Sequence, residues 1–370
     1  MRKNLNMQTL WWWLIATIYV AVAADDYETC AISTIEELKP KIQDVLTYHD
    51  DDAWFDHDSK NNLKDTLGYV TPWNNRGYDF AKKYALKFTM ICPVWYQIRT
   101  DVNTGLPVIT GTHDVDNAWI HDIRKKNPDI LIVPRFAFEM NSLTQVESET
   151  IVRLIIDELL ARKHDGLVIE IPVIAPTISF LSSLGARLNV LKKKLIIVLS
   201  PAAVLDRNGA SVAIKQLLQL VKVVYRISVN MYDYPVATGT TLLKSSNAPI
   251  YWGERLHKVF IDHDAEDVIP KLLYGIPFYG YKRVRSPKAD SVAVIGHEYL
   301  SILKESDNDE LKWDSSAKES YYENYDQVMR VYYPNLAFLS SRIDFVSENE
   351  MAGVAIWELG QGLEYFFKVL

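Results

Sequence analysis

Short apolar runs recur along the chain, and each is bounded by polar residues or by glycine and proline. Runs of this kind predict buried strands. We expect eight strands, over Leu67–Val70, Phe88–Val94, Ile130–Phe136, Gly166–Ile171, Leu195–Leu199, Val223–Met231, Lys271–Ile276 and Gly353–Trp357.

Helical patterns separate these runs. Ile151, Ile155 and Leu159 repeat at every fourth position, and a second apolar stripe runs over residues 178–191 and ends in three lysines, which suit a helix C-terminus. Eight alternations of strand and helix predict an α/β fold, the (β/α)8 TIM barrel. A doubly wound open sheet is the alternative, but no G-x-G-x-x-G follows the first run.

The longest connection runs from the seventh predicted strand to the eighth, between Pro277 and Met351. It predicts a small insertion between strands 7 and 8, with a hairpin around Trp313 and the Tyr321-Tyr322 pair. We expect the barrel to occupy residues 58–370 and an N-terminal leader segment to occupy residues 24–57.

The first 23 residues have the pattern of a secretory signal peptide. Arg2 and Lys3 precede an apolar run that ends in Ala21-Val22-Ala23. This run is too short to span a bilayer, so we expect cleavage and no membrane insertion. The mature protein is then expected in the extracellular space or the lysosome.

Composition narrows the classes of partner. Nearly half of the residues, 48%, are apolar, which is enough for a sizeable core. Lysine and arginine number 40 against 47 aspartates and glutamates, for a net charge of −7 without a basic tract, which argues against nucleic acid. Two cysteines exclude a disulfide-built scaffold, and whether Cys30 and Cys92 pair stays open.

Chemistry in a TIM barrel belongs at the C-terminal ends of the strands. Aromatic rings and carboxylates gather at these predicted ends, a combination that suits a sugar because its faces stack on rings and its hydroxyls bond to carboxylates. The alternative is that the aromatic residues fill the barrel ends as ordinary core. The residues in question are Trp95, Glu139, Glu170, Tyr232, Asp233, Tyr279, Trp357 and Glu358.

The fourth predicted strand carries the most informative carboxylate. Side chains alternate along a strand, so Val168 and Glu170 are expected to face the barrel axis. Glu170 would then point into a crowded interior, where a carboxylate costs several kcal/mol unless it is paired or protonated. Glu170 could serve in catalysis or in a buried hydrogen-bond network, and the sequence leaves both roles open.

Four motifs follow one another along the chain: Asp165-Gly166-Leu167, Asn230-Met231-Tyr232-Asp233-Tyr234, Gly275-Ile276-Pro277-Phe278-Tyr279-Gly280 and Gly353-Val354-Ala355-Ile356-Trp357-Glu358. Their order resembles glycoside hydrolase family 18, the chitinase family, over roughly residues 60–370. Further stretches, among them Cys92-Pro93-Val94-Trp95, His113-Asp114-Val115-Asp116 and Trp313-Asp314-Ser315, resemble its chitinase domain-containing (stabilin-interacting chitinase-like) branch.

The chain departs from the family at the catalytic motif. Active members carry D-G-x-D-x-D-x-E on the fourth strand, where the last Glu is the acid and the substrate's own N-acetyl group is the nucleophile. Anchored on Asp165, the chain places Val168 and Glu170 at the positions of the second and third Asp of the motif and Pro172 at the position of its Glu. A shift by two makes Glu170 the acid but replaces both supporting aspartates, so either alignment predicts very weak or absent hydrolysis.

The binding half of the family's site is retained. The resemblance implies that Trp357 forms the floor under the sugar and that Tyr232 and Asp233 contact the N-acetyl region. Position alone adds Trp95, Tyr279 and Glu139, and Glu170 is a ligand-binding candidate as well as the acid of an active enzyme. We expect no cofactor.

These features predict a secreted chitinase-like protein that binds carbohydrate. The expected ligand is an oligosaccharide, a chitin oligomer, or a glycolipid such as lipopolysaccharide, and a scavenger-type receptor is the partner that the resemblance implies. One rival is a weakly active hydrolase with Glu170 as acid and Asp233 or Glu358 assisting. The other is an interaction protein whose barrel mouth is closed by its own side chains.

His113, Asp114 and Asp116 have the spacing of a metal cluster. The branch resemblance places them just before a helix that begins near Asp116, so a capping role for one of the aspartates is the favoured interpretation. We therefore expect no metal site here.

Overall fold

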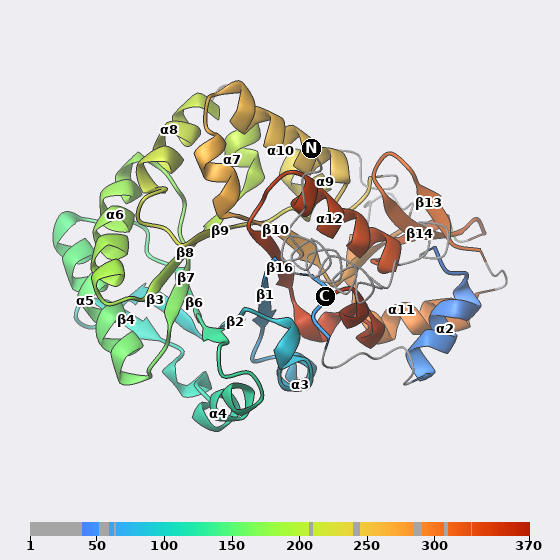
Figure 1. Ribbon diagram of the computed structural model, residues 1–370, viewed down its shortest axis with the longest axis horizontal. Helices are drawn as coiled ribbons and strands as arrows, with labels where there is room; N and C mark the ends of the chain where they lie inside the picture. The colour runs from blue at the N-terminus through green and yellow to red at the C-terminus, as the bar shows by residue number, and fades with distance from the viewer. Residues whose placement is uncertain are drawn as a thin grey trace, which may run out of the picture. The chain divides into compact units, whose positions relative to one another are not determined.

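The strands of the barrel pair in parallel in chain order, and the last strand returns to pair with the first (Figure 1). Leu67 lies opposite Ala355 across this seam. The predicted TIM barrel is thereby confirmed. Its strands are β1 (Asp65–Val70), β2 (Met90–Pro93) with β3 (Tyr96–Thr100), β5 (Leu131–Ile132) with β6 (Arg135–Phe138), β7 (Gly166–Glu170), β8 (Lys194–Leu199), β9 (Arg226–Val229), β10 (Leu272–Pro277) and β16 (Gly353–Trp357).

Two of the barrel strands are interrupted, and both continue further than predicted. β2 pairs with β5 and β3 pairs with β6, so the breaks lie side by side. Pro134 has no N–H to offer a ladder, which suits the break between β5 and β6. Its carbonyl still accepts from Val168 N at 3.0 Å, so the ring stays closed across the gap. β4 (Pro107–Thr110) adds an antiparallel strand to the edge of β3.

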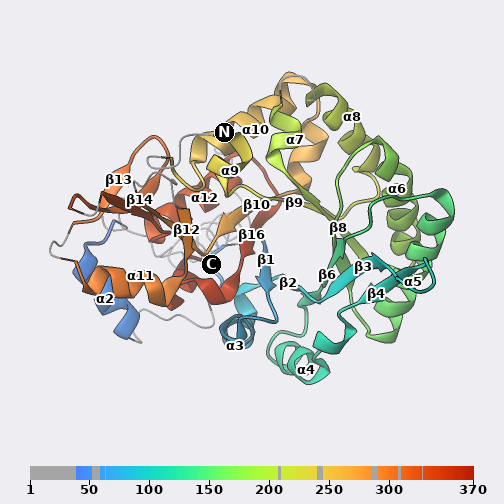
Figure 2. The same cartoon turned by 180° about the vertical axis from the view of Figure 1, so that it is seen from behind.

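Helices surround the ring (Figure 2). The predicted stripes of α5 and α6 bury Ile151, Ile155 and Leu159, and Leu181 and Leu184, respectively. α5 begins where the Thr144 side chain accepts a hydrogen bond from Glu147 N. The helices are α3 (Asn75–Lys83), α4 (Asn117–Lys126), α5 (Gln145–Ala161), α6 (Ala175–Val190), α7 (Pro201–Leu205), α8 (Ala210–Leu220), α9 (Tyr234–Thr238), α10 (Ile250–Asp262) and α12 (Leu336–Glu348).

The insertion between the seventh and eighth barrel strands is larger than the small hairpin that the sequence predicted. The hairpin exists, with Trp313 opposite Ser320, but it is the edge of a five-stranded antiparallel sheet in the order β12-β11-β15-β14-β13. These strands are short and carry many charged residues, so they show little apolar alternation. The elements are β11 (Gly280–Val284), β12 (Ser291–Val294), α11 (Gly296–Lys304), β13 (Lys312–Asp314), β14 (Glu319–Asn324) and β15 (Met329–Tyr332).

The computed structural model describes residues 39–51, 59–62, 64–206, 210–239, 245–284, 291–306, 310–326 and 328–370. Within the expected leader, α2 (Ile42–Asp50) buries Ile42 and Val45 and packs against α11 and the C-terminal 3-10 helix Glu364–Val369 (Figure 1). The expected signal peptide and Cys30 lie outside the described residues. Of the helices that are described, none combines the length and apolar character needed to cross a bilayer.

The barrel interior below the strand ends is a packed apolar core. Cys92 is fully buried there, and burial raises the pKa of its thiol. Val168 also faces this interior, as the alternation along its strand predicted. The core residues are Leu67, Tyr69, Met90, Cys92, Val94, Val133, Val168, Ile196, Leu273 and Ala355.

Candidate functional site

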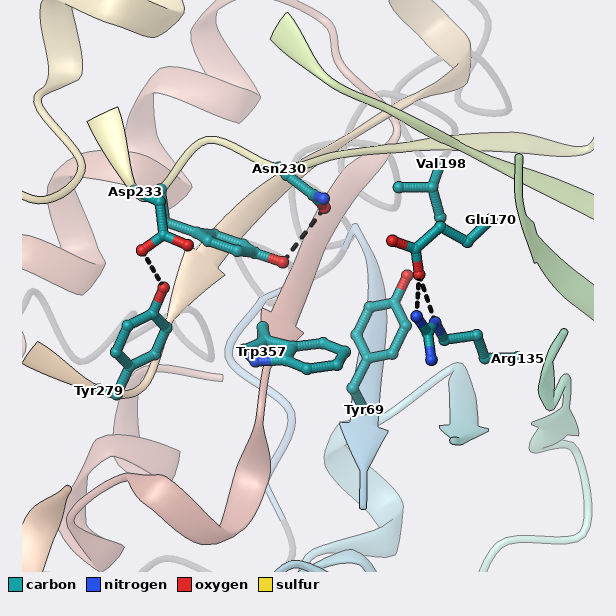
Figure 3. A pocket seen from close by; sticks show the side chains of 9 residues that line it. Tyr69, Arg135, Glu170, Val198, Asn230, Asp233, Tyr279 and Trp357 are labelled. Atoms are coloured by element: carbon teal, nitrogen blue, oxygen red, sulfur yellow. Dashed lines mark hydrogen bonds and ion pairs between the residues drawn. The ribbon is translucent and has the colours of Figure 1, made fainter. Parts of the chain in front are cut away.

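A cleft lies at the C-terminal ends of the barrel strands (Figure 3). It consists of a cavity of about 230 Å³ and an adjoining hollow of about 390 Å³, which share Arg135, Glu170, Val198 and Asn230. Volumes of this size are typical of small-molecule sites. The cavity is also lined by Tyr69, Tyr232, Asp233, Tyr279 and Trp357, and the hollow by Ala137, Phe138, Glu139, Ile171, Pro172 and Ser200.

Trp357 forms the floor of the cavity. It is the last residue of β16, and its ring centroid lies 5.2 Å from that of Tyr69 on the neighbouring strand β1. The Tyr69 hydroxyl donates to Ser228 Oγ at 3.0 Å, and burial raises the pKa of Tyr69 well above its ordinary value. Tyr69 is therefore a neutral, fixed support for the indole, which exposes a flat apolar surface to the cavity (Figure 3).

Asp233 forms one end of the cavity, just before α9. Its Oδ1 accepts hydrogen bonds from the hydroxyls of Tyr279 at 2.5 Å and Tyr281 at 2.9 Å. Burial, and then the neighbouring carboxylate of Asp233, raise the pKa of Tyr281 to about 12, so this donor stays protonated. The backbone of Asp233 has a φ of 60°, which aspartate tolerates better than most residues.

The insertion supports Asp233 from behind. Asn247 Oδ1 accepts from Asp233 N at 3.1 Å, and the carboxylate of Glu319 on β14 accepts from Asn247 N and Ala248 N at 3.0 and 2.6 Å. Burial raises the pKa of Glu319, and the Arg342 guanidinium opposes that rise. No sequence motif indicated this network, because its members are far apart in the chain.

Glu170 forms the opposite end of the cavity and is ion-paired. Arg135 of β6 donates from both Nε and Nη2 to Glu170 Oε2 (Figure 3). The expectation of a carboxylate in a crowded interior is wrong, because the Glu170 side chain is 44% exposed and faces the open cleft. Val168, two residues earlier, is the last fully buried residue on this face of β7.

Arg135 is the site residue that the sequence analysis missed. It sits at the start of β6 and lies opposite Val168 in the register with β7, which brings its long side chain to Glu170. The predicted third strand ended at Phe136, and nothing in the local sequence around Arg135 assigns a role to this residue. The register between the two strands supplies the missing information.

Trp95 is not brought to the cleft. It is fully buried, and its Nε1 donates to the Tyr78 hydroxyl of α3 at 2.7 Å. Its ring packs edge-on against Trp119 of α4. The second barrel strand continues past Trp95 to Thr100, so this residue lies at a break within the strand and not at its end. The expectation that Trp95 contacts ligand is therefore corrected.

The other two predicted carboxylates, Glu139 and Glu358, lie in different environments: one lines the hollow and the other is buried outside the cleft. Glu139 lines the hollow and forms an exposed ion pair with Arg99 at 2.7 Å. Glu358 is only 1% exposed and lines neither part of the cleft. Its Oε1 accepts from Asn74 Nδ2 at 2.5 Å and its Oε2 from Gly360 N at 3.1 Å, so it joins the end of β16 to the turn before α3.

Glu358 is expected to make the stability of the protein depend on pH. Burial raises its pKa to about 7 against the lowering effect of its hydrogen bonds, from an ordinary value of 4.5. Between these values the folded state holds a proton that the unfolded chain releases. The free energy of unfolding therefore falls as the pH rises from about 4.5 to about 7, by up to about 3 kcal/mol.

Urea unfolding of the wild type and Glu358→Gln at pH 5 and pH 8 measures this contribution. Other titrating groups cancel in the difference between the two proteins at each pH. The free energy of unfolding of the wild type, relative to that of Glu358→Gln, should be lower at pH 8 than at pH 5. An identical pH dependence in both proteins would contradict the assignment.

Asp116, one of the three residues with the spacing of a metal cluster, caps a helix, as the sequence analysis favoured. Asp116 accepts from Trp119 N at 2.9 Å at the start of α4, which confirms the capping interpretation. His113 forms an exposed contact with Asp114 at 3.6 Å. Across the part of the chain that the structure describes, no group of three or more His, Cys, Asp or Glu side chains could hold a metal ion.

The class of protein that these features define is a TIM barrel with an inserted antiparallel sheet and an aromatic cleft at the strand ends. The sequence model of glycosyl hydrolases family 18 matches residues 149–362. Since this match covers more than half of the chain, the protein belongs to glycosyl hydrolases family 18.

Solved structures of chitinases have the same fold. A chitinase from Chromobacterium violaceum is 17% identical with a TM-score of 0.67, over 83% of this chain and 98% of that chain. The Group IV chitinase of Ostrinia furnacalis is 15% identical with a TM-score of 0.66, over 83% and 98%. The family 18 chitinase of Cycas revoluta in complex with (GlcNAc)3 is 13% identical with a TM-score of 0.65, over 82% and 97%.

Proposed function

We propose that the cleft binds oligosaccharides containing N-acetylglucosamine and does not hydrolyse them. The observation that carries this proposal is the state of Glu170, the carboxylate that would be the acid of an active enzyme. Arg135 holds Glu170 through a hydrogen bond from Nε and an ion pair from Nη2, so this carboxylate is an acceptor that faces a cation. A general acid must carry the proton that it gives to the glycosidic oxygen.

The neighbouring positions offer no replacement acid. In the alignment on Asp165, the family's acid falls at Pro172, which lies exposed at the rim of the hollow and has no proton to give. Val168 replaces a supporting aspartate and is buried in the barrel core. Both observations favour a protein that has lost the chemistry of the family.

The binding surface is the part of the site that supports a sugar ligand. Trp357 supplies a flat ring for stacking, and Asp233 with Tyr232 supplies polar groups beside it. The Cycas revoluta chitinase contains (GlcNAc)3 in its complex, which supports the same class of ligand for this chain. The open cavity argues against a barrel mouth closed by its own side chains. We also propose that the protein is secreted, as its N-terminal sequence predicts.

We expect the purified protein to bind the N-acetylglucosamine tetramer without cleaving it. Isothermal titration calorimetry should give a saturable heat, and chromatography of the same mixture after a day should show only the tetramer. Shorter products that disappear in Glu170→Gln would establish the hydrolase instead. The absence of any heat with the tetramer would favour the interaction protein.

A further inference from the structure

We propose that the cavity prefers deacetylated amino sugars, with the ammonium group of a glucosamine unit bound between the Asp233 carboxylate and the aromatic rings beside it. This inference rests on the proposed function, because the same cavity must first accept the oligosaccharide. The ligand class is thus a chitin oligomer in which some or all acetyl groups have been removed.

The charges in the cavity do not balance. Arg135 and Glu170 neutralise each other at one end. At the other end the partners of Asp233 are the neutral hydroxyls of Tyr279 and Tyr281. Among the described residues, no lysine, arginine or histidine forms an ion pair with Asp233. Within the described part of the chain, Asp233 is therefore a cavity carboxylate without an ion-pair partner.

Arg283 acts on the charge of Asp233 through space but forms no ion pair with it. It lies two residues after Tyr281 on β11 and is 2% exposed, with its guanidinium 5.3 and 5.4 Å from the ring centroids of Tyr281 and Tyr332. Arg283 is thus held against the two rings and is beyond reach of a ligand. Among the described residues none offers a cation to Asp233 from the cavity side, so a cationic group of a ligand can take that place.

The free oxygen of Asp233 has the surroundings of an ammonium site. Both tyrosine hydroxyls bond to Oδ1, and within the described chain Oδ2 accepts no hydrogen bond. Tyr232, Tyr279 and Trp357 line the same cavity, and Figure 3 shows the carboxylate of Asp233 beside the Tyr279 hydroxyl, with Glu170 on the opposite side of Trp357. Aromatic faces attract cations, and a carboxylate among them adds a charged hydrogen bond.

We expect a neutral acetamide group to bind at this site more weakly than an ammonium group. Covering Asp233 with an acetylated sugar removes water from a carboxylate and returns no opposite charge, which costs free energy. An ammonium group in the same position neutralises the carboxylate and gains the cation–π attraction. We expect the deacetylated oligomer to bind about tenfold more tightly than the acetylated one.

The test compares the glucosamine tetramer with the N-acetylglucosamine tetramer by calorimetry in mildly acidic buffer, where the amines are charged. The wild type should prefer the glucosamine tetramer, and Asp233→Asn should bind both tetramers with equal affinity. Asparagine can still accept from both tyrosines and tolerates the left-handed backbone, so the variant is expected to fold, as thermal unfolding will check. Asp129→Asn, an exposed carboxylate before β5, is the control with the same change in net charge and should keep the preference.

Tetralysine controls for the attraction of any small polycation to an acidic protein, and it should not compete with the glucosamine tetramer. Equal or tighter binding of the acetylated tetramer by the wild type would overturn the inference while the proposed function stands. A preference for glucosamine that survives in Asp233→Asn would also overturn it. Binding of neither tetramer would remove the inference together with the proposed function.

Discussion

Replacing Arg342 with methionine is expected to lower the free energy of unfolding by about 3–5 kcal/mol. Arg342 is fully buried in α12, and its guanidinium donates to the carbonyls of Ala248 at 2.7 Å and Ala317 at 2.9 Å. Methionine fills a similar volume but removes both donated bonds, after which the Ala317 carbonyl keeps its bond from Ile250 N at 2.9 Å and the Ala248 carbonyl loses the guanidinium. The substitution also removes a positive charge that favours the ionised form of the buried Glu319 carboxylate.

Urea unfolding of the two proteins at constant pH measures the loss. Arg153→Met, at an exposed arginine on α5, is the matched control and should change the free energy of unfolding by less than about 0.5 kcal/mol. Adding Glu319→Gln to Arg342→Met should recover part of the stability, because the uncompensated charge is then gone. A loss below about 1 kcal/mol for Arg342→Met would show that Arg342 does not carry the stability assigned to it.

Arg342 also connects the stability of the insertion to the binding site. Its acceptor Ala248 lies next to Asn247, which bonds to the backbone of Asp233. A variant that loosens this loop should weaken ligand binding as well as folding. The insertion therefore supports the site. It contributes Tyr281, which bonds to Asp233, and Glu319, which bonds to the backbone of Ala248, although neither residue lines the cavity.

The barrel could be predicted from the sequence because its strands are buried on both faces. Continuous apolar runs such as Gly166–Ile171 and Leu195–Leu199 stand out between amphipathic helices, and their order alone indicates the fold. The second and third strands were located correctly but ended too early, because each is broken and resumes with a less apolar segment, Tyr96–Thr100 and Arg135–Phe138. Hydropathy does not reveal that a strand resumes after a break.

The site was predictable only where a local motif carries it. Tyr232, Asp233, Tyr279 and Trp357 lie in motifs at strand ends, and the structure brings all four to one cavity. Trp95 was misassigned through the break described above. The partners of these residues depend on register and tertiary contacts, which no local pattern encodes.

Glu170 illustrates this limit most clearly. Its expected burial followed from the alternation along one strand, which correctly places Val168 inside the barrel. Beyond the last buried layer the barrel opens, so the same alternation directs Glu170 into the cleft and towards Arg135. Alternation defines a face of a strand, and only the depth of the core decides whether that face is buried.

Replacing Trp357 with alanine is expected to weaken binding of the N-acetylglucosamine tetramer by on the order of a hundredfold. The indole is the flat floor of the cavity, and its loss removes the stacking surface for the sugar together with the contact to Tyr69. Calorimetry measures the affinity, and Trp357→Phe should recover part of it because a smaller ring still stacks. Trp313→Ala is the matched control, since Trp313 on β13 lines neither part of the cleft and should leave the affinity unchanged. An equal loss in both alanine variants would mean that the effect comes from the fold, whereas unchanged binding in Trp357→Ala would place the sugar elsewhere.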